Sequence, residues 1–161
     1  MCDYSLQGLP NRLALEGEQL ITHRFCTGSI GLAAAEEVYA MQRPGAAPVR
    51  KSWWSRLKAW VTPAETAQIT AVCIPPGTTL LMSQIHQKLR RDFGLGVIES
   101  VTFDQLTAEA FRFRDAVRLS GGKTLLLQTI PTGVRFAVVS LGSSERATIG
   151  ERRDSPSIPA A

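Results

Sequence analysis

The chain has few cysteines and no long apolar run. Its three cysteines, Cys2, Cys26 and Cys73, are odd in number and widely spaced, and no two of them form a CxxC pair. This pattern excludes a disulfide-rich secreted scaffold, so we expect reduced thiols. No apolar run approaches the roughly 18 residues that a membrane-spanning helix needs. The N-terminus lacks the basic and then apolar regions of a secretory signal. We therefore expect a cytoplasmic protein.

The composition indicates one folded domain with an uneven distribution of charge. Of the 161 residues, 44% are hydrophobic and 20% are charged, which is enough apolar surface to bury a core. The net charge is +4, yet the stretch from Arg43 to Trp60 holds five basic residues and no acidic one. Subtracting those five charges from +4 leaves about −1 for the rest of the chain. The sequence therefore describes a near-neutral domain that carries one basic segment.

Most of the chain shows the pattern of short strands. In residues 20–25 the alternation places Ile21, His23 and Phe25 on one face, with a break at Thr27-Gly28 before a second strand. A short helix follows over residues 34–42. Further strands are predicted at residues 69–74, 79–82 and 96–101, and three more within residues 116–141, with turns at residues 120–123 and 131–133.

Two more helices are predicted from capping patterns. Ser83 is placed to cap a helix that runs to about Phe93 and is stopped by Gly94. Thr102 and Gln105 have the spacing of a capping box. The helix expected after this box has an apolar face made of Phe103, Leu106, Ala110 and Phe113.

These elements predict an α+β fold: a small antiparallel sheet or partly open barrel with two or three short helices. Residues 1–42 supply the N-terminal strands and helix of the core, and residues 67–142 supply the remainder of the same domain. Residues 43–66 interrupt it with a Pro/Gly linker and a basic, Trp-rich segment, and we call this stretch the insert. Residues 143–161 are expected to be a disordered tail, since they have little to bury.

Two motifs resemble chemical sites but fit a structural role better. Gly121-Gly122-Lys123-Thr124 contains the GKT of a phosphate-binding loop, but Val117 stands where that motif needs glycine, so we interpret it as a hairpin turn. Three cysteines and a histidine could bind zinc on paper, but their spacing is loose. We therefore expect no metal and no cofactor. The residues of that paper site are Cys2, His23, Cys26 and Cys73.

The insert is the stronger candidate for function. Helical spacing places Trp53, Leu57 and Trp60 on one face, bordered by Trp54, while Lys51, Arg56 and Lys58 lie elsewhere. Such an amphipathic segment suits an anionic membrane surface or a groove on a protein partner. Nucleic acid is a weaker candidate, because no known nucleic-acid-binding module surrounds these residues. The structural alternative is that the three rings pack on the protein's own sheet.

Cys2 is the second candidate. Removal of Met1 would leave Cys2 with a free α-amine that can act as a base beside its thiol. In its Met1-Cys2 start the chain is similar to glutamine amidotransferases of the N-terminal nucleophile type and to proteins that capture abasic DNA through a terminal cysteine. Both families continue with glycine, whereas this chain has Asp3. MCDYSL, followed by PNRLA and EGE, also resembles a group of short bacterial proteins of unknown function.

The sequence thus predicts a small cytoplasmic binding or adaptor domain, peripheral to a membrane or bound to a protein partner. Its partner-binding residues are in the insert. The alternative is an enzyme or covalent trap with processed Cys2 as nucleophile.

Overall fold

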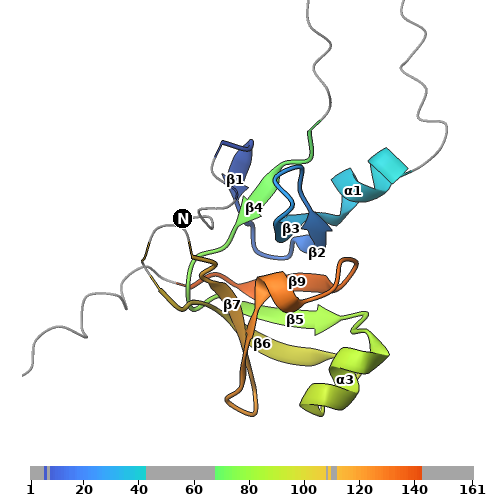
Figure 1. The fold of residues 1–161 in the computed structure, drawn as a ribbon, viewed down its shortest axis with the longest axis vertical. Coiled ribbons are helices and arrows are strands. Elements are labelled where there is room, and N and C mark those ends of the chain that lie inside the picture. The colour runs from blue at the N-terminus through green and yellow to red at the C-terminus, as the bar shows by residue number, and fades with distance from the viewer. Residues whose placement is uncertain (1–5, 7, 43–67, 108, 110–111, 143–161) are drawn as a thin grey trace, which may run out of the picture.

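The computed structural model describes residues 6, 8–42, 68–107, 109 and 112–142. These residues form β-strands, two α-helices and a short 3-10 helix (Figure 1). The strands are β1 (Asn11–Leu13), β2 (Gln19–Arg24), β3 (Ile30–Ala34), β4 (Ala71–Cys73), β5 (Thr79–Ser83), β6 (Glu99–Gln105), β7 (Asp115–Leu119), β8 (Thr124–Leu126) and β9 (Arg135–Ser140). The helices are α1 (Ala35–Gln42), α3 (Gln87–Phe93) and the 3-10 helix η2 (Leu127–Thr129).

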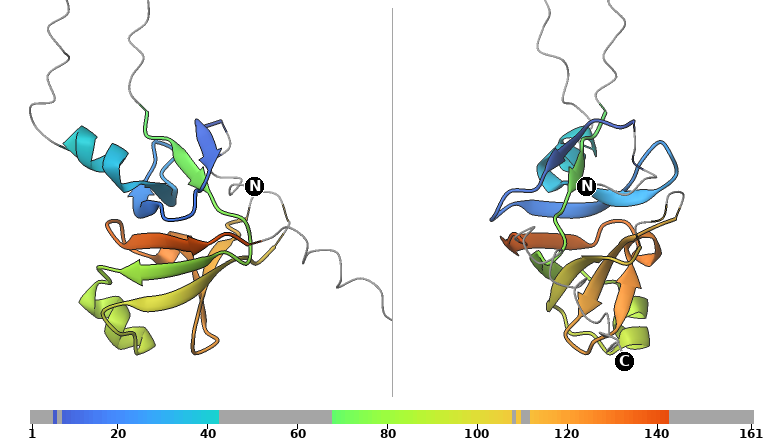
Figure 2. Two further views of the ribbon diagram at one scale, coloured as in Figure 1. Left: turned by 180° about the vertical axis from the view of Figure 1, so that it is seen from behind. Right: turned by 90° about the vertical axis from the view of Figure 1, so that its left-hand side faces the viewer.

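The strands make one nine-stranded sheet in the order β1-β4-β3-β2-β9-β5-β6-β7-β8. All neighbouring pairs are antiparallel except β1 and β4, which are parallel. The α+β prediction is confirmed, and the sheet is mixed rather than purely antiparallel. Strands β2 and β3 and helix α1 separate β1 from β4 in the chain, a connection long enough to return in the same direction. Figure 2 shows α1 beside β1–β4 and α3 beside β5 and β6, at opposite ends of the molecule.

The sheet has a buried cluster on each side, which explains why neighbouring residues of β2 are both buried. Leu20 belongs to the main cluster, which also contains Phe136 of the neighbouring strand β9 and Phe103 of β6. Ile21, on the opposite face, belongs to a smaller cluster with Val38 of α1. Each such side chain contributes roughly 1.5–3 kcal/mol by leaving water. The predicted alternation in residues 20–25 is confirmed, and it serves two cores rather than one.

The connection between β8 and β9 is fastened to β2 and β3 by two polar side chains. The Gln128 side chain accepts a hydrogen bond from the Ile30 N–H at 3.0 Å and donates one to the Ile30 carbonyl at 2.9 Å. The Thr22 hydroxyl donates to the Pro131 carbonyl at 2.7 Å and accepts from the Val134 N–H at 2.9 Å. These side-chain hydrogen bonds hold η2 to β3, and the turn after η2 to β2. They take the place of the backbone hydrogen bonds that join paired strands elsewhere in the sheet.

The prediction of a helix after the Thr102–Gln105 capping box is wrong. Both residues lie in β6, which pairs with β5 and β7. Val101 and Phe103 are buried while Thr102 is exposed, so the period of this segment is two. Leu106 and Phe113, predicted to share a helical face with Phe103, are about half exposed.

The predicted cap at Ser83 is also wrong, because Ser83 is the last residue of β5. Helix α3 begins only at Gln87, after Gln84 adopts a φ of 53° that breaks the strand direction. Its end is as predicted. Gly94 has a left-handed φ of 68°, which glycine adopts without steric cost.

The strands and turns predicted for the last third of the domain are confirmed. The turn between β7 and β8 contains Gly122 at a φ of 79°, as a hairpin turn requires, so the GKT sequence belongs to a hairpin. Neither α1 nor any other described helix has the length and apolar character needed to cross a membrane. The predicted tail, residues 143–161, lies outside the described residues.

Candidate functional site

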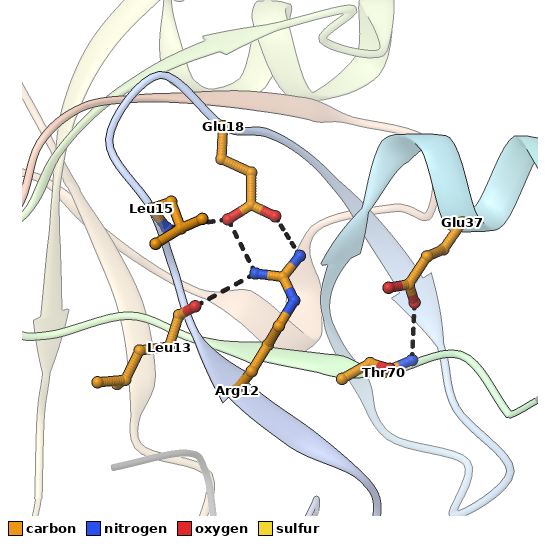
Figure 3. Close-up of polar contacts among 6 residues, drawn as sticks. All are labelled: Arg12, Leu13, Leu15, Glu18, Glu37 and Thr70. Atoms are coloured by element: carbon orange, nitrogen blue, oxygen red, sulfur yellow. Dashed lines mark hydrogen bonds and ion pairs between the residues drawn. The ribbon is translucent and has the colours of Figure 1, made fainter.

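The described segments before and after the insert are joined by a polar contact. Helix α1 ends at Gln42, just before the insert, and the described chain resumes at Gln68. The Glu37 carboxylate accepts a hydrogen bond from the Thr70 N–H at 3.0 Å (Figure 3). One residue later, Ala71 pairs with Ala33 of β3. The helix before the insert is therefore hydrogen-bonded to the residue that precedes β4, the strand after the insert.

The position of Glu37 follows from the local sequence. Acidic residues favour the first turn of a helix because the N-terminal end of the helix dipole is positive. From that turn the half-buried Glu37 side chain reaches the backbone just before β4 begins. Thr70 precedes the strand, so its N–H lies outside the pairs of the sheet, and the carboxylate satisfies it.

An ion pair between β1 and the start of β2 lies next to this contact (Figure 3). Arg12 donates two hydrogen bonds to the Glu18 carboxylate, one of them 3.1 Å long, and the Leu15 N–H donates to the same carboxylate at 2.9 Å. A two-pronged contact of this kind fixes orientation as well as distance. Arg12 also pairs through its backbone with Val72 of β4. We call Arg12, Glu18, Glu37 and Thr70 together the insert base.

The charges of the insert base are coupled. The hydrogen bond from Arg12 lowers the pKa of Glu18 below its usual range, against the opposing effect of burial. The same bond, assisted by the negative charges of Glu18 and Glu37, raises the pKa of Arg12. Both groups therefore stay ionised at neutral pH, and the ion pair keeps β1 and the turn before β2 in place beside β4.

The residues predicted to bind a partner lie outside the described residues, as does Cys2. The structure therefore positions the residues that flank the insert, up to Gln42 and from Gln68 onward. The partner-binding residues concerned are Lys51, Trp53, Trp54, Arg56, Leu57, Lys58 and Trp60.

The remaining members of the zinc site considered above occupy different environments. His23 packs edge-on against Phe25, with ring centroids 5.1 Å apart, and burial lowers the pKa of His23. Cys26 is an exposed free thiol. Cys73 is buried in β4 and is part of a disulfide, which corrects the expectation that the cysteines are reduced. Within the described part of the chain, no three His, Cys, Asp or Glu residues are grouped to hold a metal.

Comparisons with protein-family models, with curated proteins and with solved structures found no match.

A second surface feature is a groove of about 500 Å³ between α3 and the β8 strand. Its lining includes the apolar side chains of Leu89, Phe93 and Leu125, together with Lys88 and Asp92, which are opposite in charge. Such a groove offers hydrophobic contact but no net charge that would select an ionic ligand. The groove is far along the sheet from the insert base, which is next to β1 and β4.

Sequence reasoning missed the insert base. The helix dipole is enough to account for acidic residues in the first turn of α1, and no sequence pattern distinguishes Arg12 or Glu18. Glu37 and Thr70 are 33 positions apart, so nothing local in the sequence pairs them.

Proposed function

We propose that the protein is a small cytoplasmic binding or adaptor domain that docks through its insert, onto an anionic membrane surface or onto a protein partner. The observation that carries the proposal is the Glu37–Thr70 hydrogen bond, which joins the described segments before and after the insert. The bond holds the described residues on either side of the insert next to each other. The proposal includes the basic, Trp-rich amphipathic segment of the insert and a disordered tail over residues 143–161.

The chemistry of the insert favours the membrane as the first partner to test. Tryptophan side chains prefer the interface between water and lipid, and basic residues are attracted to anionic headgroups. Burial of an apolar side chain of this size contributes about 2 kcal/mol, which corresponds to more than a tenfold change in affinity. Each basic residue near the surface contributes about 1 kcal/mol.

Co-sedimentation with vesicles tests the proposal. Phosphatidylcholine vesicles with and without phosphatidylserine are incubated with the full chain and with the Trp53→Ala/Trp60→Ala variant. We expect the wild type to sediment with the anionic vesicles and the variant to remain in solution. The matched control is Val97→Ala/Ile98→Ala, which removes two exposed apolar side chains outside the insert and should bind as the wild type does.

A charge-matched pair of variants tests the electrostatic part. Arg56→Ala/Lys58→Ala and Lys88→Ala/Arg91→Ala both remove two positive charges, but only the first pair lies in the insert. We expect only the first variant to lose binding. Equal loss in both would mean that overall charge, not the insert, drives the association. If the wild type does not bind vesicles, the remaining proposal is that the insert docks into a groove on a protein partner.

The second candidate function is an enzyme or covalent trap that uses processed Cys2 as its nucleophile. It is supported by the Met1-Cys2 start alone. Intact mass tests its first requirement, because retention of Met1 would exclude a free α-amine on Cys2. The rate of alkylation of Cys2 against pH tests the second, since a nucleophilic thiolate reacts well below pH 8.

A further inference from the structure

The strand at one end of the sheet, β8, lines a groove together with helix α3. The lining of this groove, about 500 Å³ in volume, includes every residue of β8 and one side of α3. In the order of the sheet β8 follows β7 and comes last, so none of the described strands pairs with its second side. We call this feature the α3–β8 groove.

The pairing of β8 with β7 fixes which of its backbone groups point outward. The Leu119 N–H donates to the Lys123 carbonyl at 2.8 Å, which makes these residues a hydrogen-bonded pair. Such pairs alternate with non-hydrogen-bonded ones along an antiparallel ladder, so the next hydrogen-bonded pair is Val117 with Leu125. The N–H and the carbonyl of Thr124, between them, therefore point away from β7 at the edge of the sheet.

The side chains of the groove are mainly apolar. Leu89 of α3 and Leu125 of β8 both belong to the main cluster, and Phe93 packs against it. In an extended peptide every second side chain points to the same side. A peptide that pairs with β8 can therefore place alternate apolar side chains against the same lining that α3 and β8 share.

The charge next to the groove favours an acidic peptide. Within the lining, Lys88 and Asp92 balance each other. Lys123 is outside the lining but next to it, since its Nζ is 5.9 Å from the centre of the Phe93 ring. Its positive charge lies at the start of β8, beside the outward backbone groups of Thr124.

We propose that the α3–β8 groove binds an acidic peptide in extended conformation, which adds to β8 as a further strand and places an apolar side chain in the groove. β8 has three residues, so the paired length is about 10 Å. A second copy of this chain is a poorer occupant, because short edge strands that carry lysine resist pairing with another sheet edge. The proposal does not depend on docking of the insert.

Selection from a random dodecapeptide library displayed on phage tests the proposal. The library is selected on the immobilised full chain, and the affinity of the enriched peptides is measured by fluorescence anisotropy. We expect enriched sequences to carry alternate apolar residues and at least one acidic residue. Lys123→Glu should weaken their binding about two- to fivefold, and this loss should vanish for peptides whose acids are replaced by amides.

Two substitutions at one position test the backbone contact. Thr124→Pro removes the outward N–H but neither hydrogen-bonded pair with β7, and proline is tolerated in edge strands, so peptide binding should weaken about tenfold. Thr124→Ala is the matched control, since it keeps the N–H and should bind as the wild type does.

Amide NMR spectra of the wild type give a readout that does not require Thr124→Pro to fold. We expect the bound peptide to shift the Thr124 and Leu126 amide signals and to slow their hydrogen exchange. The proposal is overturned if no peptide is enriched, if the enriched peptides bind folded Thr124→Pro as tightly as the wild type, or if their shifts avoid β8. Dimers in analytical ultracentrifugation that Thr124→Pro abolishes would also overturn it, because a second copy would then occupy the edge.

Discussion

Replacement of Gln128 by alanine tests whether one side chain fastens the β8–β9 connection to β3. The variant loses the hydrogen bonds to both backbone groups of Ile30, which is 6% exposed. A typical intramolecular hydrogen bond contributes about 0.5–1.5 kcal/mol net, and a buried group left without a partner costs more. Loss of two such bonds therefore predicts a decrease of about 1–3 kcal/mol in the free energy of unfolding.

Urea unfolding followed by far-UV circular dichroism measures this change. Gln128→Glu keeps the acceptor and loses the donor, so it should show about half the loss. Thr129→Ala is the neighbouring control, since its hydroxyl bonds only to the Leu126 carbonyl in an exposed position. It should change the free energy by about 0.5 kcal/mol or less. A Gln128→Ala variant within 0.5 kcal/mol of the wild type would refute the fastening role.

Three further predictions concern the sheet and the insert base. Glu18→Gln should lower the free energy of unfolding by about 1 kcal/mol at pH 7. Arg12 lowers the pKa of Glu18, so this stabilisation is present above the pKa of Glu18 in the unfolded chain and is lost as the pH falls through its pKa in the folded protein. Urea unfolding should therefore show a smaller difference between variant and wild type at pH 3. Phe103→Ala should cost about 3–5 kcal/mol in the same assay and Phe113→Ala much less, a contrast that a shared helical face would not give. A Cβ on Gly142 would lie 2.8 Å from the Gly77 backbone, so Gly142→Ala should lower the thermal midpoint by several degrees, for a cost of about 1–3 kcal/mol; Gly121→Ala, with open space around it, should leave the midpoint unchanged.

Local sequence patterns predicted those parts of the fold that are determined by residues close together in the chain. The alternation in β2 and the glycine that ends α3 are of this kind. The failure at β6 has a clear cause. Residues three and four apart in a short apolar run also match a helix, and only pairing with β7 and the burial of Phe103 decide for a strand.

Long-range contacts could not be predicted in the same way. Gln128 and Ile30 are 98 positions apart, and each is unremarkable in its own segment. The insert base also depends on long-range contacts, since Glu37 can bond to Thr70 only after β4 has paired with β3. The Cys73 disulfide belongs here too, because cysteine spacing alone does not report which residues the fold brings together.

Intrinsic tryptophan fluorescence tests the central claim most directly, because all three tryptophans of the chain lie in the insert. The emission of the native protein therefore reports on the insert alone. We expect emission close to that of the urea-unfolded chain in free solution, with a blue shift and protection from acrylamide quenching when anionic vesicles or a partner are added. Native emission that is already blue-shifted and protected, and that no vesicle changes, would show that the tryptophans pack on their own domain and would contradict the proposed docking role.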